Sequence, residues 1–153
     1  VRGVKAHQDV GVLLKSAAAA IGIDLDLKVA ETAVYTNALF RKAFSTAVGG
    51  TSAKLDDPDL TLGDYYVTDS SRNYAGYGNP VFDELYVKQV RTLDMVERRK
   101  IVWEMQRILL RDVPIAITYW SNVAYAWWRE VRGFNPPVSF FHAYGYQEIW
   151  LAK

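Results

Sequence analysis

Two kinds of apolar spacing alternate in the first part of the chain. Over residues 8–21 the apolar side chains recur every three or four positions, which predicts a helix, and Gly22 is placed to end it. Residues 23–29 then alternate strictly between apolar and polar side chains, which predicts a strand with one apolar face. A helix, a glycine and a strand in so few residues indicate an α/β fold.

The pattern weakens over the next fifty residues. A second helix is expected over residues 32–44 and a short strand over residues 45–48. Residues 49–60 are rich in Gly, Ser and Asp, which predicts a loop, and residues 61–78 predict an irregular, partly helical stretch.

The stretch "YGNPVFDEL" predicts a helix start. Asn79 can accept hydrogen bonds from the first turn, Pro80 suits the first helical position, and two acids stand near the positive end of the helix dipole. These acids, Asp83 and Glu84, are adjacent, so their side chains point about 100° apart and cannot act together on one atom. They are therefore expected to serve the helix start and not catalysis. The buried face of this helix is expected to comprise Phe82, Leu85, Tyr86 and Val90.

A further helix is expected to follow at once. Asp94 and Glu97 have the spacing of a capping box, and Pro114 would end the helix. The run "ERRK", residues 97–100, is expected to face water, and the core side to comprise Ile101, Met105, Ile108 and Leu109. The β-rich runs "IAITYW" and "VAYAWW" then predict a hairpin, and "FFHAYGYQEIWL" a last β-type region.

Composition narrows the class of protein without identifying it. The chain has 153 residues, of which 50% are hydrophobic, so it suits one folded domain. Eighteen basic and 17 acidic residues give a net charge of +1, which is no reason to expect nucleic acid or an anionic membrane as partner. The lack of cysteine excludes disulfides and thiolate metal sites.

The run of residues 77–120 closely resembles the C-terminal lobe of family 5 extracellular solute-binding proteins. These are the dipeptide-, oligopeptide- and nickel-binding components of ABC importers. The resemblance extends over about residues 8–134, including the "IGIDLDL" junction and the "VRGF" turn. The matching elements are Tyr77, Asn79, Pro80, residues 82–85, residues 94–98, Gln106, Asp112 and Pro114.

The resemblance implies one lobe of a periplasmic-binding-protein type II (clamshell) fold, with a mixed sheet flanked by helices. Residues 1–153 would be part of a solute-binding protein: a C-terminal lobe at about residues 8–134, and a C-terminal segment that packs toward an N-terminal lobe. Such a protein captures a peptide-like or other small polar solute between its lobes and delivers it to a membrane permease. The implied location is periplasmic or extracellular, either free or as a membrane-associated lipoprotein.

The resemblance also indicates where a ligand would be bound. Peptide-binding members carry G-W-x-x-D-Y-x-x-P at the cleft, and the aspartate pairs with the ammonium group of the peptide. When Gly50 and Pro58 are aligned with this motif, Thr51 replaces the tryptophan and Lys54 the aspartate. A lysine repels an ammonium group and attracts a carboxylate or phosphate, so the usual amine anchor is not expected here.

Four further residues are candidate ligand contacts. Asp56 or Asp57 would supply the amine anchor if the loop were shifted, and Arg72 and Asn73 precede the Tyr77 motif in a region that the family uses near its cleft. The alternative is that the lysine is solvated and that these residues form surface turns. Aromatic residues either stack on the ligand or pack in the core or between lobes: Trp120, Tyr125, Trp127 and Trp128.

Two other classes of function stay open at this stage. A peptide-holding, chaperone-like module would share the fold but bind many peptides weakly. A hydrolase would need a carboxylate pair such as Asp57 with Asp83, whose separation the sequence does not give. His7 and His142 lie far apart without a motif, so neither nickel, haem nor any other cofactor is expected.

We expect the chain by itself to associate with further copies, because an apolar surface should be exposed where the other lobe would pack. Sedimentation velocity over a range of concentrations measures this directly. A strict monomer at high concentration would contradict the expectation.

Overall fold

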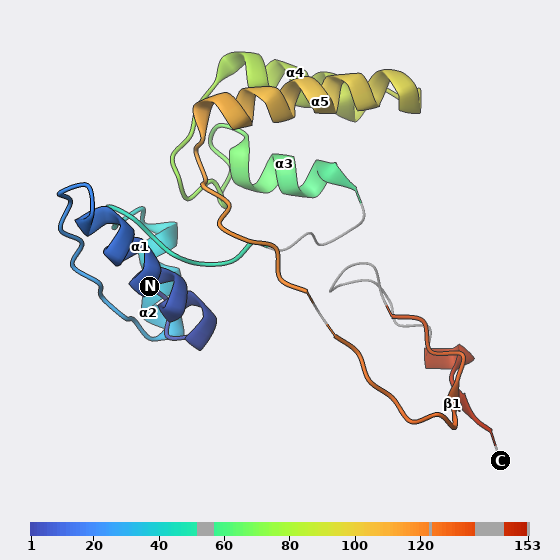
Figure 1. Cartoon of the computed structure of the whole chain (residues 1–153). Helices are drawn as coiled ribbons and strands as arrows, with labels where there is room; N and C mark the ends of the chain where they lie inside the picture. The colour runs from blue at the N-terminus through green and yellow to red at the C-terminus, as the bar shows by residue number, and fades with distance from the viewer. Residues whose placement is uncertain (52–56, 123, 137–145, 153) are drawn as a thin grey trace.

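The computed structural model describes residues 1–51, 57–122, 124–136 and 146–152, and these form three parts (Figure 1). One part holds the first two helices of the chain and the second part the next three, and the third is an extended arm that ends in a small sheet (Figure 1). In chain order the elements are α1 (Lys5–Ala19), α2 (Thr32–Phe40), α3 (Pro58–Tyr66), α4 (Pro80–Arg91), α5 (Met95–Asp112), β1 (Val131–Arg132), the 3-10 helix η1 (Tyr146–Glu148) and β2 (Trp150–Leu151).

The core lies in the three-helix part, where α4 packs against both α5 and α3. Its buried side chains come from all three helices: Leu62, Phe82, Ile101, Val102, Met105 and Ile108. The rings of Tyr66 and Tyr77 meet Phe82 edge-on, with centroids 6.2 and 6.0 Å from it. Helix α3 approaches α4 closely at Gly63, where a Cβ would collide with the side chain of Tyr86. The predicted core side of α5 is confirmed, because Ile101, Met105 and Ile108 are buried in this core and Leu109 packs against it.

The predicted face of α4 is wrong at one position. Phe82 is buried and Leu85 and Tyr86 pack at the edge of the core, but Val90 is 53% exposed. Its neighbour Gln89 is the buried residue, because its carboxamide is hydrogen-bonded to side chains of α3 and α5.

The predicted starts of α4 and α5 are confirmed. Asn79 Oδ1 accepts hydrogen bonds from Val81 N (3.1 Å) and Phe82 N (3.2 Å), with Pro80 as the first helical residue. Asp94 Oδ1 accepts from the backbone N–H groups of the second and third residues of α5 at 3.0 and 2.8 Å. Each cap satisfies backbone donors that a helix cannot pair internally. The carboxylate of Glu97 pairs with Lys100 (2.6 Å).

The loop expected at residues 49–60 is wrong at its end, because residues 58–60 belong to helix α3. The side chain of Asp57 caps this helix by accepting a hydrogen bond from Asp59 N (2.8 Å), and Pro58 is its first residue. Asp-Pro therefore gives the same start signal as the Asn-Pro that opens α4, although Asp and Pro also favour turns.

The predicted strands at residues 23–29 and 45–48 and the predicted hairpin are not formed within the part of the chain that the structure describes. Residues 23–29 follow Gly22, which takes the left-handed conformation (φ 80°) expected of a glycine after a helix. The next residue, Ala30, forms a single parallel bridge with Arg2 near the start of the chain. The sheet that is present joins β1 to β2 in antiparallel register, Val131 opposite Leu151. Alternation sets which face of a strand is apolar, but a strand also needs a neighbour to pair with its backbone.

The chain exposes more surface than a compact protein of its size. Its accessible area is 11472 Å², whereas about 7,800 Å² is expected for a compact monomer of its mass. Of residues 1–51 only Gly11 is buried, so α1 and α2 do not enclose a core of their own. Among the described residues no helix is long and apolar enough to cross a membrane.

A hydrogen-bonded carboxylate joins the end of α5 to the start of α4. Asp112 accepts from Arg111 Nε (2.8 Å), the Tyr77 hydroxyl (2.7 Å) and Asn79 Nδ2 (3.0 Å). The bond from Arg111, followed by those from Tyr77 and Asn79, lowers the pKa of Asp112 from 3.8 to about 2. Tyr77, Asn79 and Asp112, which belong to the run that resembles the solute-binding family, are thus joined by one set of hydrogen bonds.

We expect Asp112→Asn to lower the melting temperature at pH 7 and to have little effect at pH 2. The folded protein holds the carboxylate ionised at a lower pH than the unfolded chain does, so its contribution is present above pH 3.8 and is lost as the pH falls to about 2. Melting followed by circular dichroism at each pH measures the difference, with Asp26→Asn as an exposed control. A difference between wild type and variant that persists unchanged at pH 2 would contradict this assignment.

Candidate functional site

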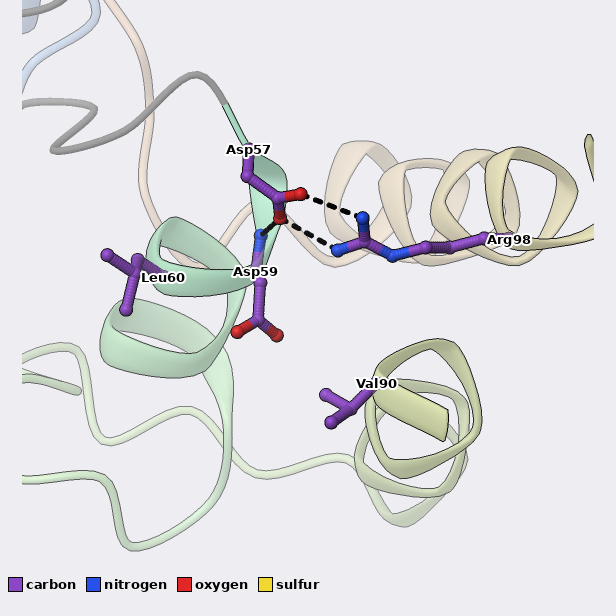
Figure 2. Close-up of a pocket in the computed structure, with 5 residues that line it drawn as sticks. All are labelled: Asp57, Asp59, Leu60, Val90 and Arg98. Carbon is purple, nitrogen blue, oxygen red and sulfur yellow. Dashed lines mark hydrogen bonds and ion pairs between the residues drawn. The ribbon is translucent and has the colours of Figure 1, made fainter. Parts of the chain in front are cut away.

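The start of α3 is fixed by a bidentate ion pair (Figure 2). Arg98 Nη1 and Nη2 donate to the two carboxylate oxygens of Asp57, each at 2.7 Å. The hydrogen bonds from Arg98 hold the pKa of Asp57 below its ordinary value, and the same bonds raise the pKa of Arg98. The Arg98 side chain is 17% exposed and that of Asp57 40%, so the pair is partly shielded from water.

Two further side chains extend this pair into a network across three helices. Arg98 Nε donates to Gln89 Oε1 (2.9 Å), and Gln89 Nε2 donates to Asp59 Oδ1 (2.7 Å). Gln89 is fully buried, so both halves of its carboxamide need partners, and the network supplies them. We call these four residues, Asp57, Asp59, Gln89 and Arg98, the Arg98 network.

A small hollow of about 290 Å³ lies beside the Arg98 network (Figure 2). It is lined by Asp57, Asp59, Leu60, Val90 and Arg98. Its charged groups already bind one another and its remaining walls are aliphatic, so the hollow offers shape and apolar surface more than free charge. Among the described residues no three His, Asp or Glu side chains are grouped so as to hold a metal ion.

The candidate ligand residues fall in different places. Thr51 is exposed and follows Gly49 and Gly50, against which the side chains of Tyr35 and His7 lie. Lys54 and Asp56 lie outside the described residues. Asp57 is the ion-paired residue of the Arg98 network.

The other two candidates lie in the loop before α4. Arg72 is partly exposed and lies 3.7 Å from the carboxylate of Asp64. Asn73 is only 2% exposed: its Nδ2 donates to Val67 O (3.1 Å) and Tyr77 O (2.6 Å), and its Oδ1 accepts from Tyr77 N (3.0 Å). Asn73 therefore closes its own loop, and ligand contact by these residues stays a prediction.

Two acids considered for catalysis have structural partners. Asp83 Oδ1 accepts from Thr68 N (3.0 Å), which ties the preceding loop to the first turn of α4. Asp57 is bound by Arg98. Each carboxylate thus holds a different helix start.

The aromatic residues of the arm differ in their contacts. Trp127 meets Phe134 edge-on with centroids 4.9 Å apart, and the ring of Tyr125 lies 6.0 Å from the same phenylalanine. Trp120 and Trp128 are largely exposed.

Arg98 and Gln89 were missed from the sequence. "ERRK" was expected to face water, but Arg98 is turned inward. Its position carried a signal, because it precedes the buried Ile101 by three residues and Met105 by seven and so lies on the same side of the helix.

We expect Arg98→Met to raise the pKa of Asp57 toward its ordinary value and to destabilise the protein by about 1–2 kcal/mol, because Asp57 and the buried carboxamide oxygen of Gln89 lose the hydrogen bonds that Arg98 donates. Carbon-13 NMR of the Asp57 carboxyl against pH measures the first effect, and urea unfolding the second. Arg99→Met, at an exposed position of the same helix, is the control. An unchanged Asp57 titration in the Arg98 variant would contradict the pairing.

Comparison with known proteins places the fold. No protein-family model matches the chain, and no curated protein matches it. Among solved structures, the pheromone receptor PrgZ matches 100% of the chain with a TM-score of 0.78 and 19% identity. OppA of Burkholderia pseudomallei matches 99% with a TM-score of 0.75 and 20% identity. The ABC transporter substrate-binding protein CtaP of Listeria monocytogenes matches 69% with a TM-score of 0.63 and 27% identity.

The chain spans less than a third of the length of these proteins: 29% of PrgZ, 30% of OppA and 22% of CtaP. The match to PrgZ nevertheless runs through the whole of this chain, so the likeness is not confined to one local motif. The chain therefore has the fold of one part of a substrate-binding protein, which confirms the resemblance that its sequence indicates.

Proposed function

We propose that the chain is part of the substrate-binding component of an ABC importer, which captures a peptide-like or other small polar solute between two lobes and delivers it to a membrane permease. The observation that carries this proposal is the match to PrgZ along 100% of the chain at a TM-score of 0.78. PrgZ is a pheromone receptor that binds peptide, and CtaP is an ABC transporter substrate-binding protein.

In this proposal the chain contributes the C-terminal lobe, at about residues 8–134, with a mixed sheet flanked by helices. Residues 23–29 alternate between apolar and polar side chains but form no strand with the described residues. The end of the segment is bonded to the start of the chain, through Val1 N to Lys28 O and the bridge at Ala30, and the alternation suits a strand that pairs with a part of the protein outside the described residues. The surface in excess of a compact monomer and the exposed Trp120 and Trp128 support packing of the arm toward an N-terminal lobe.

The proposed role is non-covalent capture outside the cytoplasmic membrane, periplasmic or extracellular, with permease subunits as the partner and no chemistry on the solute. Asp57 and Asp83, the acids considered for hydrolysis, hold helix starts by hydrogen bonds, which favours a structural role for both.

The proposed ligand contacts are Thr51, Lys54, Asp56, Asp57, Arg72 and Asn73. Both oxygens of Asp57 are bound by Arg98, so its negative charge is already compensated and an ammonium group gains little from it. This favours a ligand held through an anionic group, for which Lys54 has the matching charge.

We expect tetra-alanine to bind weakly, with a dissociation constant on the order of millimolar, because one lobe supplies only half of the cleft. N-acetylation of the peptide should leave the affinity nearly unchanged, whereas C-terminal amidation should weaken binding about tenfold, a loss of ~1.4 kcal/mol. Chemical-shift titration of the nitrogen-15-labelled chain with the three peptides measures both effects.

Lys54→Ala should remove the sensitivity to amidation, and Lys15→Ala, at an exposed helical lysine, should keep it. Loss of binding on N-acetylation would contradict the anionic anchor. Absence of binding by every peptide would contradict peptide capture itself.

A further inference from the structure

Helix α5 has apolar side chains on two opposite sides. The inner side packs in the core through Ile101, Met105 and Ile108. On the outer side Val96 is 61% exposed, Trp103 52% and Leu110 80%. A surface helix normally has one apolar stripe, so the outer residues are not explained by packing within the three-helix part.

The three outer residues lie along one line of the helix. They are seven positions apart, and each step of seven turns the helix to within about 20° of the same direction, over a total length of about 21 Å. Single residues at this spacing are typical of a seam between two helices. A helix that lies in a membrane surface has an apolar face about 100° wide or more, and this seam is narrower.

Three of the four residues beside the seam are basic. Lys100 and Arg107 flank it on one side, and Arg99 and the neutral Gln106 on the other, all within about 60° of the line. The acids that pair with two of them, Glu97 (2.6 Å to Lys100) and Glu104 (2.8 Å to Arg107), lie about 100–120° from the line. A second copy of α5 against this seam would bring cations against cations, which disfavours self-pairing here.

We propose that the outer face of α5 is a docking surface for a helix of a partner protein, one with an apolar seam at the same seven-residue spacing, flanked by Asp and Glu. Trp103 is the central anchor, as aromatic residues often are in helix-binding surfaces, and the flanking cations select the partner by charge. Figure 1 shows α5 lying along α4, and the chain that continues from the end of α5 leads to the arm that carries β1. The proposal does not depend on solute capture.

The test uses the 153-residue chain and two synthetic helical peptides, stapled so that they stay helical and labelled for fluorescence anisotropy. Both have leucine at seven-residue spacing; one carries Glu beside the seam and the other Lys. We expect the Glu peptide to bind at least about tenfold more tightly than the Lys peptide, with an affinity that falls as salt rises. The triple variant R99E, K100E, R107E should reverse the preference.

Trp103→Ala and, separately, Leu110→Glu should each weaken binding of the Glu peptide about tenfold or more, with helix content checked by circular dichroism. The matched control is Trp128→Ala, which removes a more exposed tryptophan on the arm and should leave the affinity unchanged. Equal binding of the two peptides, or equal effects of the two tryptophan variants, would overturn the proposal. Binding to phosphatidylserine vesicles that is lost in Trp103→Ala, without selective peptide binding, would assign the face to a membrane and also overturn it, as would self-association that depends on Trp103.

Discussion

The three-helix part is held together by the Arg98 network, which joins the start of α3 to α4 and α5. Asp57 and Arg98 are 41 residues apart in the chain, and their two hydrogen bonds fix the start of α3 against α5. Helix α3 has nine residues, too few to be stable alone, so its order has to come from the groups that it contacts. The buried carboxamide of Gln89 adds a condition: it is tolerated only because a donor on α5 and an acceptor on α3 both meet it.

Outside the three-helix part, the described residues are mostly exposed to solvent. Residues 1–51 have no enclosed core, and a described contact from α2 toward the three-helix part runs through aromatic rings, Phe40 against Tyr74 (5.4 Å) and Tyr74 against Tyr65 (6.4 Å). The accessible surface is larger than that of a compact monomer by several times the ~800 Å² that one partner contributes to a standard interface. In the proposed function, this additional surface is where the other lobe would pack.

The sequence predicted those features whose cause is local. Asn79 and Asp94 were identified as caps because a cap acts on backbone groups two or three residues away. The strand at residues 23–29 was predicted from alternation, which says nothing about the neighbouring strand on which its backbone pairing depends. The start of α3 was expected to be loop because Asp-Pro opens a turn or a helix equally well, and here Arg98, 41 residues further on, fixes the helix start.

The candidate site shows the same division. Thr51 and Lys54 were found by aligning one short motif, and no local rule could show that Asp57, three residues after Lys54, is already paired with a distant arginine. Arg98 and Arg99 are adjacent and identical in type, yet helical geometry turns one into the Asp57 pair and the other beside the exposed seam of α5. The inner arginine removes a negative charge from the neighbourhood of a proposed ligand, and the outer one adds a positive charge to a proposed partner surface. Both proposed roles therefore depend on how α5 is rotated about its own axis, which is set by the core residues Ile101, Met105 and Ile108.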